Sequence, residues 1–301
     1  MSGWDAAPGT VALVAAPAMV SVAQEAIALA GFRAVLRSAG DWPLAAGAPV
    51  LLIEAEGLAD EVLLSLLDAT AAEAASGGAA LVVSFAAGQI DLVAEALLDT
   101  GAQLLCAPNM AERVAALTLA RAWPGGGRLR ETEGDRLAML RDGIARLVAA
   151  LTRLTGEGGA AGLADTPMDY RPGETVQPAD PAEVRGEIKA RRLRDALFGA
   201  ALFEDPAWDM LLDLFAAELE GARVSVSSLC IAAAVAPTTA LRWIQRLTAL
   251  GLLLRTPDPA DGRRAFITLS GQASAAMRRY WAMVAPLRRG AGSATGGAKG
   301  A

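Results

Sequence analysis

The 301-residue chain contains no histidine. This absence excludes every Ser-His-Asp or Cys-His nucleophile and every zinc site with histidine ligands. Only two cysteines are present, Cys106 and Cys230, far apart and each within an apolar run. That placement is typical of buried, reduced thiols in a cytosolic protein, and a redox switch is the alternative interpretation.

Long apolar segments and phosphate-binding loops are also missing. No apolar run approaches the roughly 20 residues needed to cross a bilayer, and the start, MSGWDAAPGT, lacks the basic and apolar regions of a signal peptide. No GxGxxG motif follows the first predicted strand, so a dinucleotide site is not expected. We therefore expect a cytoplasmic protein with no membrane partner, no enzymatic activity, no cofactor and no metal.

Acidic and basic residues are unevenly distributed. The net charge is −6, but residues 1–180 hold 11 basic and 22 acidic residues. Residues 221–301 hold 11 basic residues and only two acidic ones, Asp258 and Asp261. Such an asymmetry is expected when one domain meets phosphate and the other does not, and a solvated basic face is the alternative.

Residues 8–124 alternate between apolar strand-like runs and helix-like segments. The predicted strands are TVALVAA, FRAVLR, PVLLIEA, AALVVSF and AQLLCAP, and the predicted helices cover residues 20–30, 59–75, 90–98 and 112–123. Five apolar strands separated by helices predict an α/β fold with a doubly wound parallel sheet.

This layout is similar to that of response-regulator receiver domains. Those domains carry an acidic pair after the first strand, an acceptor aspartate ending the third, Ser or Thr ending the fourth and Lys-Pro ending the fifth. Here Ala15-Ala16-Pro17 follows the first strand, Glu54 ends the third, Ser84 ends the fourth, and Ala107-Pro108 replaces Lys-Pro. The resemblance therefore implies a degenerate receiver that is not phosphorylated, since Mg²⁺ and the phosphoryl charge lack their partners. Glu54, at the pseudo-phosphoacceptor position, either mimics a permanent negative charge or is an ordinary strand-end carboxylate, and a generic flavodoxin-like domain remains the alternative.

Residues 130–155 have a different pattern, with apolar residues at alternating spacings of three and four. This is the a/d seam of a coiled coil, which favours a homodimer, although an amphipathic helix packed on its own domain is the alternative. The seam consists of Leu137, Leu140, Ile144, Leu147, Leu151 and Leu154. Residues 156–180, rich in Gly and Pro, are expected to form a flexible linker, and residues 290–301 a disordered tail.

Residues 181–289 predict a winged helix. Pro181 and Asp205-Pro206 begin two supporting helices, and Ser270 caps a last one. Between them, residues 224–270 predict a short strand, two helices joined by a tight turn, and a hairpin turning at Asp261-Gly262. Ser227 is expected to cap the first of these helices. The second is expected to bury Ala240, Trp243, Ile244, Leu247 and Leu250.

The stretch GLLLRTPDPADGRRAFITLS resembles the MarR-like winged-helix transcription regulators. In that family a Gly-apolar step leaves the recognition helix, and Asp-x-Arg in the wing precedes an apolar strand ending Leu-Ser/Thr. The matching positions here are Gly251-Leu252, Asp261 with Arg263, and Leu269-Ser270. The resemblance covers roughly the last third of the chain and implies a dimeric DNA-binding repressor or activator. Leu241 departs from it, because the family often has a polar residue facing DNA there.

The sequence as a whole therefore predicts a sequence-specific transcriptional regulator that binds double-stranded DNA. Helix 237–250 is expected to read the major groove, while wing 255–266 contacts the flanking groove or backbone. Asp261 is expected to shape the wing turn. The predicted DNA contacts are Thr238, Thr239, Arg242, Gln245, Arg246, Arg255, Arg263 and Arg264. The alternative function is a signalling adaptor whose winged helix docks a protein.

Overall fold

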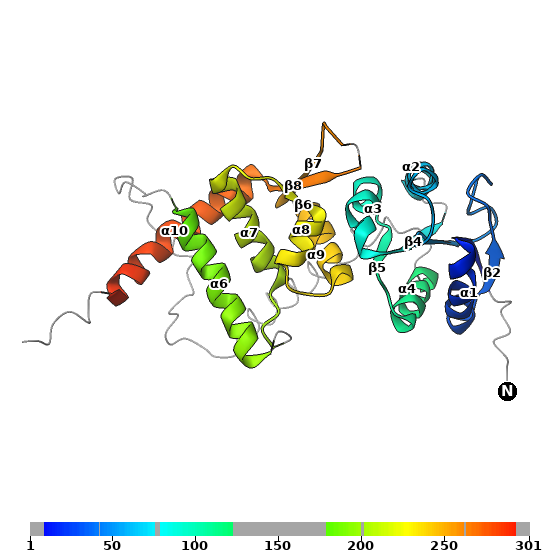
Figure 1. Ribbon diagram of the computed structural model, residues 1–301, viewed down its shortest axis with the longest axis horizontal. Coiled ribbons are helices and arrows are strands. Elements are labelled where there is room, and N and C mark those ends of the chain that lie inside the picture. Colours follow the sequence, from blue (N-terminus) through cyan, green and yellow to red (C-terminus); the bar gives the residue numbers. More distant parts are fainter. Residues whose placement is uncertain are drawn as a thin grey trace, which may run out of the picture. The chain divides into compact units, whose positions relative to one another are not determined.

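The computed structural model describes residues 9–41, 43–75, 79–122, 179–199, 202–261 and 263–292 (Figure 1). The α/β domain (residues 9–122) and the C-terminal helical part (from residue 179) belong to one compact unit. The predicted leucine seam, the linker up to residue 178 and the tail after residue 292 lie outside the described residues.

The α/β domain is built on one five-stranded sheet in which every pairing is parallel. The strands are β1 (Thr10–Ala15), β2 (Arg33–Leu36), β3 (Val50–Glu54), β4 (Ala80–Phe85) and β5 (Gln103–Cys106). Their order across the sheet is β2-β1-β3-β4-β5, which leaves β5 at an edge. All five predicted strands are present, and this order is one of the two common doubly wound orders.

Helices cover both faces of this sheet because alternate strand residues point to opposite sides. Helices α1 (Val20–Leu29) and α4 (Met110–Ala122) cover the face that includes Leu13 and Leu52. Helices α2 (Asp60–Ala75) and α3 (Ile90–Leu97) cover the face that includes Ile53 and Val83. Short 3₁₀ turns, Pro17–Met19 and Ala87–Gln89, precede α1 and α3.

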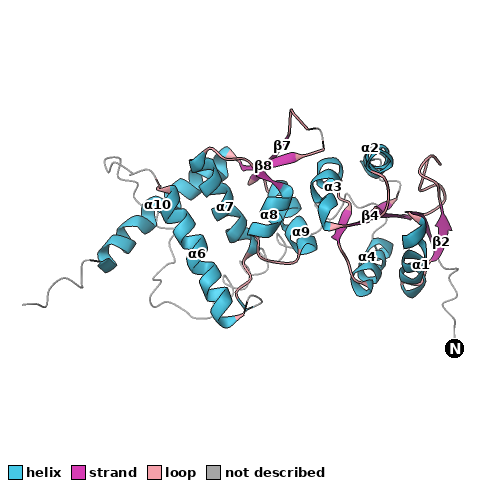
Figure 2. Cartoon of the chain, viewed as in Figure 1, coloured by secondary structure: helices cyan, strands magenta, loops and turns pink. Residues whose placement is uncertain are grey.

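The described residues that connect β2 to β3 form turns and no helix, and Figure 2 draws this connection as a loop. Leu44 is fully buried and Ala45 and Ala48 nearly so, all three in the same core as α2 and α3. The backbone N–H of Ala45 donates to the Glu73 carboxylate of α2 at 3.0 Å. Apolar side chains therefore seal this side of the sheet where a further helix would otherwise lie.

The C-terminal part has the order expected of a winged helix. Its elements are α6 (Pro181–Phe198), α7 (Pro206–Glu220), β6 (Val224–Ser225), α8 (Val226–Ala232), α9 (Pro237–Ala249), β7 (Leu253–Pro257), β8 (Ala265–Leu269) and α10 (Gly271–Gly292). Strand β8 pairs antiparallel with both β6 and β7. Asp180 and Asp205 cap α6 and α7 just before their first-turn prolines. Ser270 accepts from the Ala273 N–H at the start of α10, as predicted.

Two local predictions in this part are wrong. Ser225, not Ser227, caps α8, because its hydroxyl accepts the Ser228 N–H and the helix begins one residue later. Leu250 is 62% exposed instead of buried, because α9 ends at Ala249 and the chain turns through Gly251. Gly251 has φ +69°, the left-handed conformation that glycine adopts at helix ends.

Within the described ranges, no single helix combines the length and the apolar character needed to cross a membrane. One bent pair, Val226–Ala232 with Pro237–Ala249 at 109°, meets the length and composition criteria alone.

Candidate nucleic-acid interface

Helix α9 has one side in the core of the winged helix. Ala240, Ile244 and Leu247 recur at helical spacing and are buried, and Trp243 is half-buried beside them. Pro237 occupies the first helical position, where its missing N–H costs no intrahelical hydrogen bond. The core contacts therefore fix which side chains of α9 point away from the winged helix.

Four of the predicted DNA-contacting arginines are exposed on α9 and on the wing. Arg242 and Arg246 lie one turn apart on α9, and the Arg246 guanidinium is 5.1 Å from the Trp243 ring centroid. Arg263 and Arg264 stand at the wing tip with 52% and 60% of their side chains exposed. Cations at these places suit phosphate or base-edge contacts in a duplex.

The wing turn is shaped by Asp261, as expected. Its carboxylate accepts the backbone N–H of Arg263 at 3.1 Å, and its carbonyl accepts the N–H of Arg264. The same carboxylate lies 3.6 Å from the Arg264 guanidinium. Asp261 therefore fixes the backbone of the wing turn and faces the Arg264 guanidinium.

Two other predicted contacts on α9 bind the protein's own α/β domain. The Thr238 hydroxyl accepts the backbone N–H of Cys106, the last residue of β5, at 3.0 Å. The Gln245 side-chain amide donates to the carbonyl oxygens of Leu98 and Ala102, both at 3.2 Å. Leu241, between them at helical spacing, is fully buried. This side of α9 therefore covers the β5 edge of the sheet.

Arg255 of β7 is also held by the α/β domain. Its guanidinium lies 3.0 Å from the carboxylates of both Glu95 and Asp99, and it donates to the Glu95 backbone carbonyl. Burial raises the pKa of Glu95 above its ordinary value, and the nearby Arg255 charge opposes that rise. Arg263 reaches the same domain more loosely, 3.7 Å from Asp60 at the start of α2.

Asp91, in the first turn of α3, connects the α/β domain to α8. Its carboxylate accepts both the backbone N–H of Ser227, at 2.9 Å, and the Ser227 hydroxyl, at 2.7 Å. Ser227 therefore does not cap α8 but donates two hydrogen bonds to the α/β domain.

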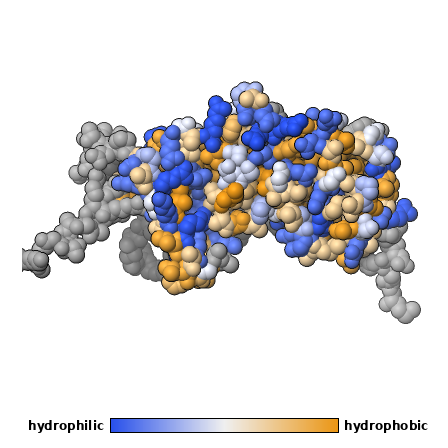
Figure 3. All heavy atoms as spheres, in the orientation of Figure 1, coloured by the Kyte–Doolittle hydropathy of each residue, from blue (hydrophilic) through white to orange (hydrophobic). Residues whose placement is uncertain are grey.

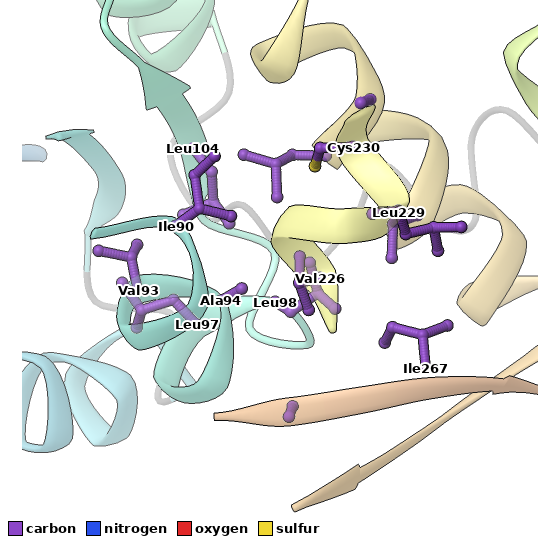
Figure 4. Packing of buried hydrophobic residues seen from close by; sticks show 14 of the residues in the cluster. Ile90, Val93, Ala94, Leu97, Leu98, Leu104, Val226, Leu229, Cys230 and Ile267 are labelled. Atoms are coloured by element: carbon purple, nitrogen blue, oxygen red, sulfur yellow. The ribbon is translucent and has the colours of Figure 1, made fainter. Parts of the chain in front are cut away.

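Apolar side chains fill the space between these polar contacts (Figure 4). Ile90, Leu97 and Leu104 of the α/β domain belong to the same buried cluster as Val226 and Leu229 of α8. Cys106 and Cys230, the only cysteines of the chain, come from the two sides and are 5% and 4% exposed. Burial raises the pKa of both thiols, that of Cys230 to about 12, where Cys106 and Asp91 add to the rise. Buried, protonated thiols of this kind are unreactive.

Glu54, the predicted pseudo-phosphoacceptor position, lies elsewhere in the α/β domain. Glu54 is fully buried, and its carboxylate is 2.9 Å from the Arg113 guanidinium of α4. Arg113 also donates to the Ser84 hydroxyl at 3.3 Å and to the Pro108 carbonyl. A cation from α4 therefore neutralises Glu54 inside the protein, which the sequence interpretation missed.

The structure thus separates the eight predicted contacts. Thr238, Gln245 and Arg255 face the α/β domain, Thr239 is half-buried, and the other four arginines are exposed. Three acidic residues that bind the winged helix were not singled out from the sequence: Glu95 and Asp99, which pair with Arg255, and Asp91, which accepts hydrogen bonds from Ser227. Their spacing of four, along the predicted helix 90–98 and one residue beyond it, was an available signal. Among the described residues, no group of three or more Cys, Asp or Glu could hold a metal ion.

No family model and no curated protein sequence matches this chain. Solved structures similar to part of it include a MarR mutant from E. coli, with 16% identity over 36% of this chain and 79% of that one, at a TM-score of 0.24. A MepR mutant from a multidrug-resistant S. aureus isolate has 15% identity over 36% and 75%, at 0.26. A Thermotoga maritima transcriptional regulator has 27% identity over 34% and 66%, at 0.22.

Proposed function

We propose that this protein is a sequence-specific DNA-binding transcriptional regulator that acts as a homodimer. The observation that carries the proposal is the set of four exposed arginines on α9 and on the wing, Arg242, Arg246, Arg263 and Arg264. A helix of this kind fits the major groove, and a hairpin tip beside it reaches the backbone or the minor groove. The scarcity of acidic residues after residue 220 favours the same function.

In this proposal the α/β domain is a degenerate receiver that takes no phosphoryl group. Glu54 stands in the acceptor position, already paired with Arg113, and the end of β1 and the two residues after it, Ala15-Ala16-Pro17, carry no carboxylates. A divalent cation would find too few oxygen ligands there. The domain therefore acts through its surface contacts and not through chemistry.

The homodimer is supported by two apolar surfaces. One is the predicted leucine seam in residues 130–155. The other consists of exposed side chains on and just after α6, where hydrophobic residues gather at its lower end in Figure 3. These are Leu193, Leu197, Phe198 and Leu202. A two-fold dimer would present two winged helices to a palindromic site.

Fluorescence anisotropy with labelled duplex DNA tests the proposal. The variant Arg242→Ala/Arg263→Ala should weaken binding by at least tenfold, and added salt should weaken wild-type binding steeply. The matched control, Arg33→Ala/Lys189→Ala, removes two exposed cations away from α9 and the wing and should bind like the wild type. Equal affinities of all three proteins would contradict the proposal.

One observation favours the second candidate, a protein-docking adaptor. Leu241 is buried in the surface where α9 meets the α/β domain, which makes this side of the helix suited to protein contact. An adaptor would bind duplex DNA weakly at every salt concentration and would bind one protein partner with little salt dependence.

A further inference from the structure

We propose that the α3–β5 side of the α/β domain is an intramolecular stand-in for DNA. Its carboxylates and backbone carbonyls occupy the surface of the winged helix that a duplex would contact, so the domain and DNA compete for it. This inference rests on the proposed function and adds its regulation.

The first support is the placement of negative charge. Asp91, Glu95 and Asp99 recur every fourth residue along one side of α3 and just past its end, about 6 Å apart along the axis. Each of these carboxylates binds a side chain of the winged helix. Asp91 accepts a hydrogen bond from Ser227, and Glu95 and Asp99 both pair with Arg255. A row of anions thus meets the wing strand and α8, as a phosphate backbone would.

The second support is that side chains of α9 predicted to contact DNA are bound to the α/β domain instead. The amide of Gln245, a group that can read adenine, instead donates to two backbone carbonyls. The Thr238 hydroxyl is bound to the end of β5, and Leu241 fills the space between them. A duplex cannot reach these three side chains while the α/β domain covers them.

The third support is the apolar packing around the polar contacts. Ile90, Leu97 and Leu104 form a continuous buried cluster with Val226 and Leu229. Because opening would expose these apolar side chains to water, we expect the closed arrangement to be the dominant one. The apparent dissociation constant for DNA then equals the intrinsic one divided by the open fraction, so variants that open the protein bind more tightly.

The decisive variant reverses the charges that face Arg255. Glu95→Arg/Asp99→Arg should open the protein, because like charges then meet at the Arg255 site. The matched control Glu25→Arg/Asp68→Arg adds the same charge at exposed positions of α1 and α2. Anisotropy with one labelled duplex should give an apparent dissociation constant at least tenfold lower for the first variant, and within about threefold of wild type for the control.

Opening is measured independently by maleimide labelling of Cys106, located by peptide mass spectrometry. Labelling of Cys106 should be slow in the wild type and in the control, and at least tenfold faster in the charge-reversed variant. In the wild type, a saturating duplex should also accelerate it, because only the open form binds. This last measurement needs no variant and decides the question if the charge-reversed protein fails to fold.

The outcomes separate the two claims. Suppose that Cys106 becomes reactive in the charge-reversed variant but the variant binds DNA no more tightly than the control. The proposal that the α/β domain competes with DNA is then wrong, while the proposed function survives. The same conclusion follows if the wild-type protein binds the duplex and the labelling of its Cys106 does not become faster. An opened variant that does not bind DNA at all refutes the proposed function, and the competition with it.

Discussion

The guanidinium of Arg113 on α4 lies 2.9 Å from the carboxylate of Glu54 at the end of β3, with both side chains buried. Glu54 is the residue that the sequence resemblance to receiver domains predicts at the acceptor position. Because the opposite charges meet at the buried C-terminal end of the central strand β3, Glu54 presents no free negative charge to a partner.

Removing one member of this pair should be costly. Arg113→Met leaves the Glu54 carboxylate buried without a counter-charge, which should lower the free energy of unfolding by about 3–5 kcal/mol. The double variant Glu54→Leu/Arg113→Leu should recover much of that loss, because no charge remains buried. Urea denaturation measures both.

The matched control for this pair is Arg278→Met, whose partner Glu218 is partly exposed. It should cost about 1 kcal/mol or less. Similar losses for Arg113→Met and Arg278→Met would show that the Glu54 pair has no special structural weight.

Leu241 lies within α9 and Leu250 directly follows its last residue, but truncating them should affect stability very differently. Leu241 is fully buried, so Leu241→Ala should lower the free energy of unfolding by about 2–5 kcal/mol. Leu250 is 62% exposed, so Leu250→Ala should change it by about 0.5 kcal/mol or less. Chemical denaturation compares the two, and equal effects would mean that Leu241 is not packed against the α/β domain.

The Cys230 thiol should make stability fall at alkaline pH. Its pKa is raised from 9.0 to about 12, chiefly by burial, so the folded protein keeps the proton that the unfolded chain loses above pH 9. The stability contributed by this group is complete below pH 9 and is lost as the pH rises towards 12. The expected slope is about 1.4 kcal/mol per pH unit.

The comparison for this effect is Cys230→Ala, which lacks the titrating group. Its free energy of unfolding should decline less steeply than that of the wild type over the same pH range. Parallel curves for the two proteins would contradict the burial of Cys230 as a protonated thiol.

The predicted leucine seam gives a test of self-association. If the protein forms the proposed dimer through this seam, replacing Leu140 and Leu147 with Glu should give a monomer, because a/d positions tolerate charge poorly. Sedimentation equilibrium measures the mass. If the double variant remains dimeric while Leu193→Glu/Leu197→Glu becomes monomeric, the exposed side of α6 carries the association instead.

Much of the fold could be predicted because it follows from local patterns. Buried parallel strands such as Val50–Glu54 form continuous apolar runs, and caps such as Asp205 and Ser270 precede their helices at fixed spacing. The cap of α8 was misassigned because three serines, Ser225, Ser227 and Ser228, stand close together there.

The partners of the site could not be predicted from such patterns. The outward side of α9 has the same spacing whether it faces solvent, a duplex or another domain, so neither Thr238 nor Gln245 was predicted to bind the α/β domain. On α9 itself Leu241 was a signal, since an apolar residue on that side is costly to expose. Arg113 was missed because its partner Glu54 lies 59 residues away in the sequence.

Hydrogen exchange at β5 tests the central claim most directly. The Cys106 amide is bonded to Thr238 in the closed protein and should exchange slowly. A saturating duplex should accelerate exchange in residues 103–107 and protect residues 263–264 of the wing. Binding of DNA that leaves exchange at β5 unchanged would contradict competition between the α/β domain and DNA for α9.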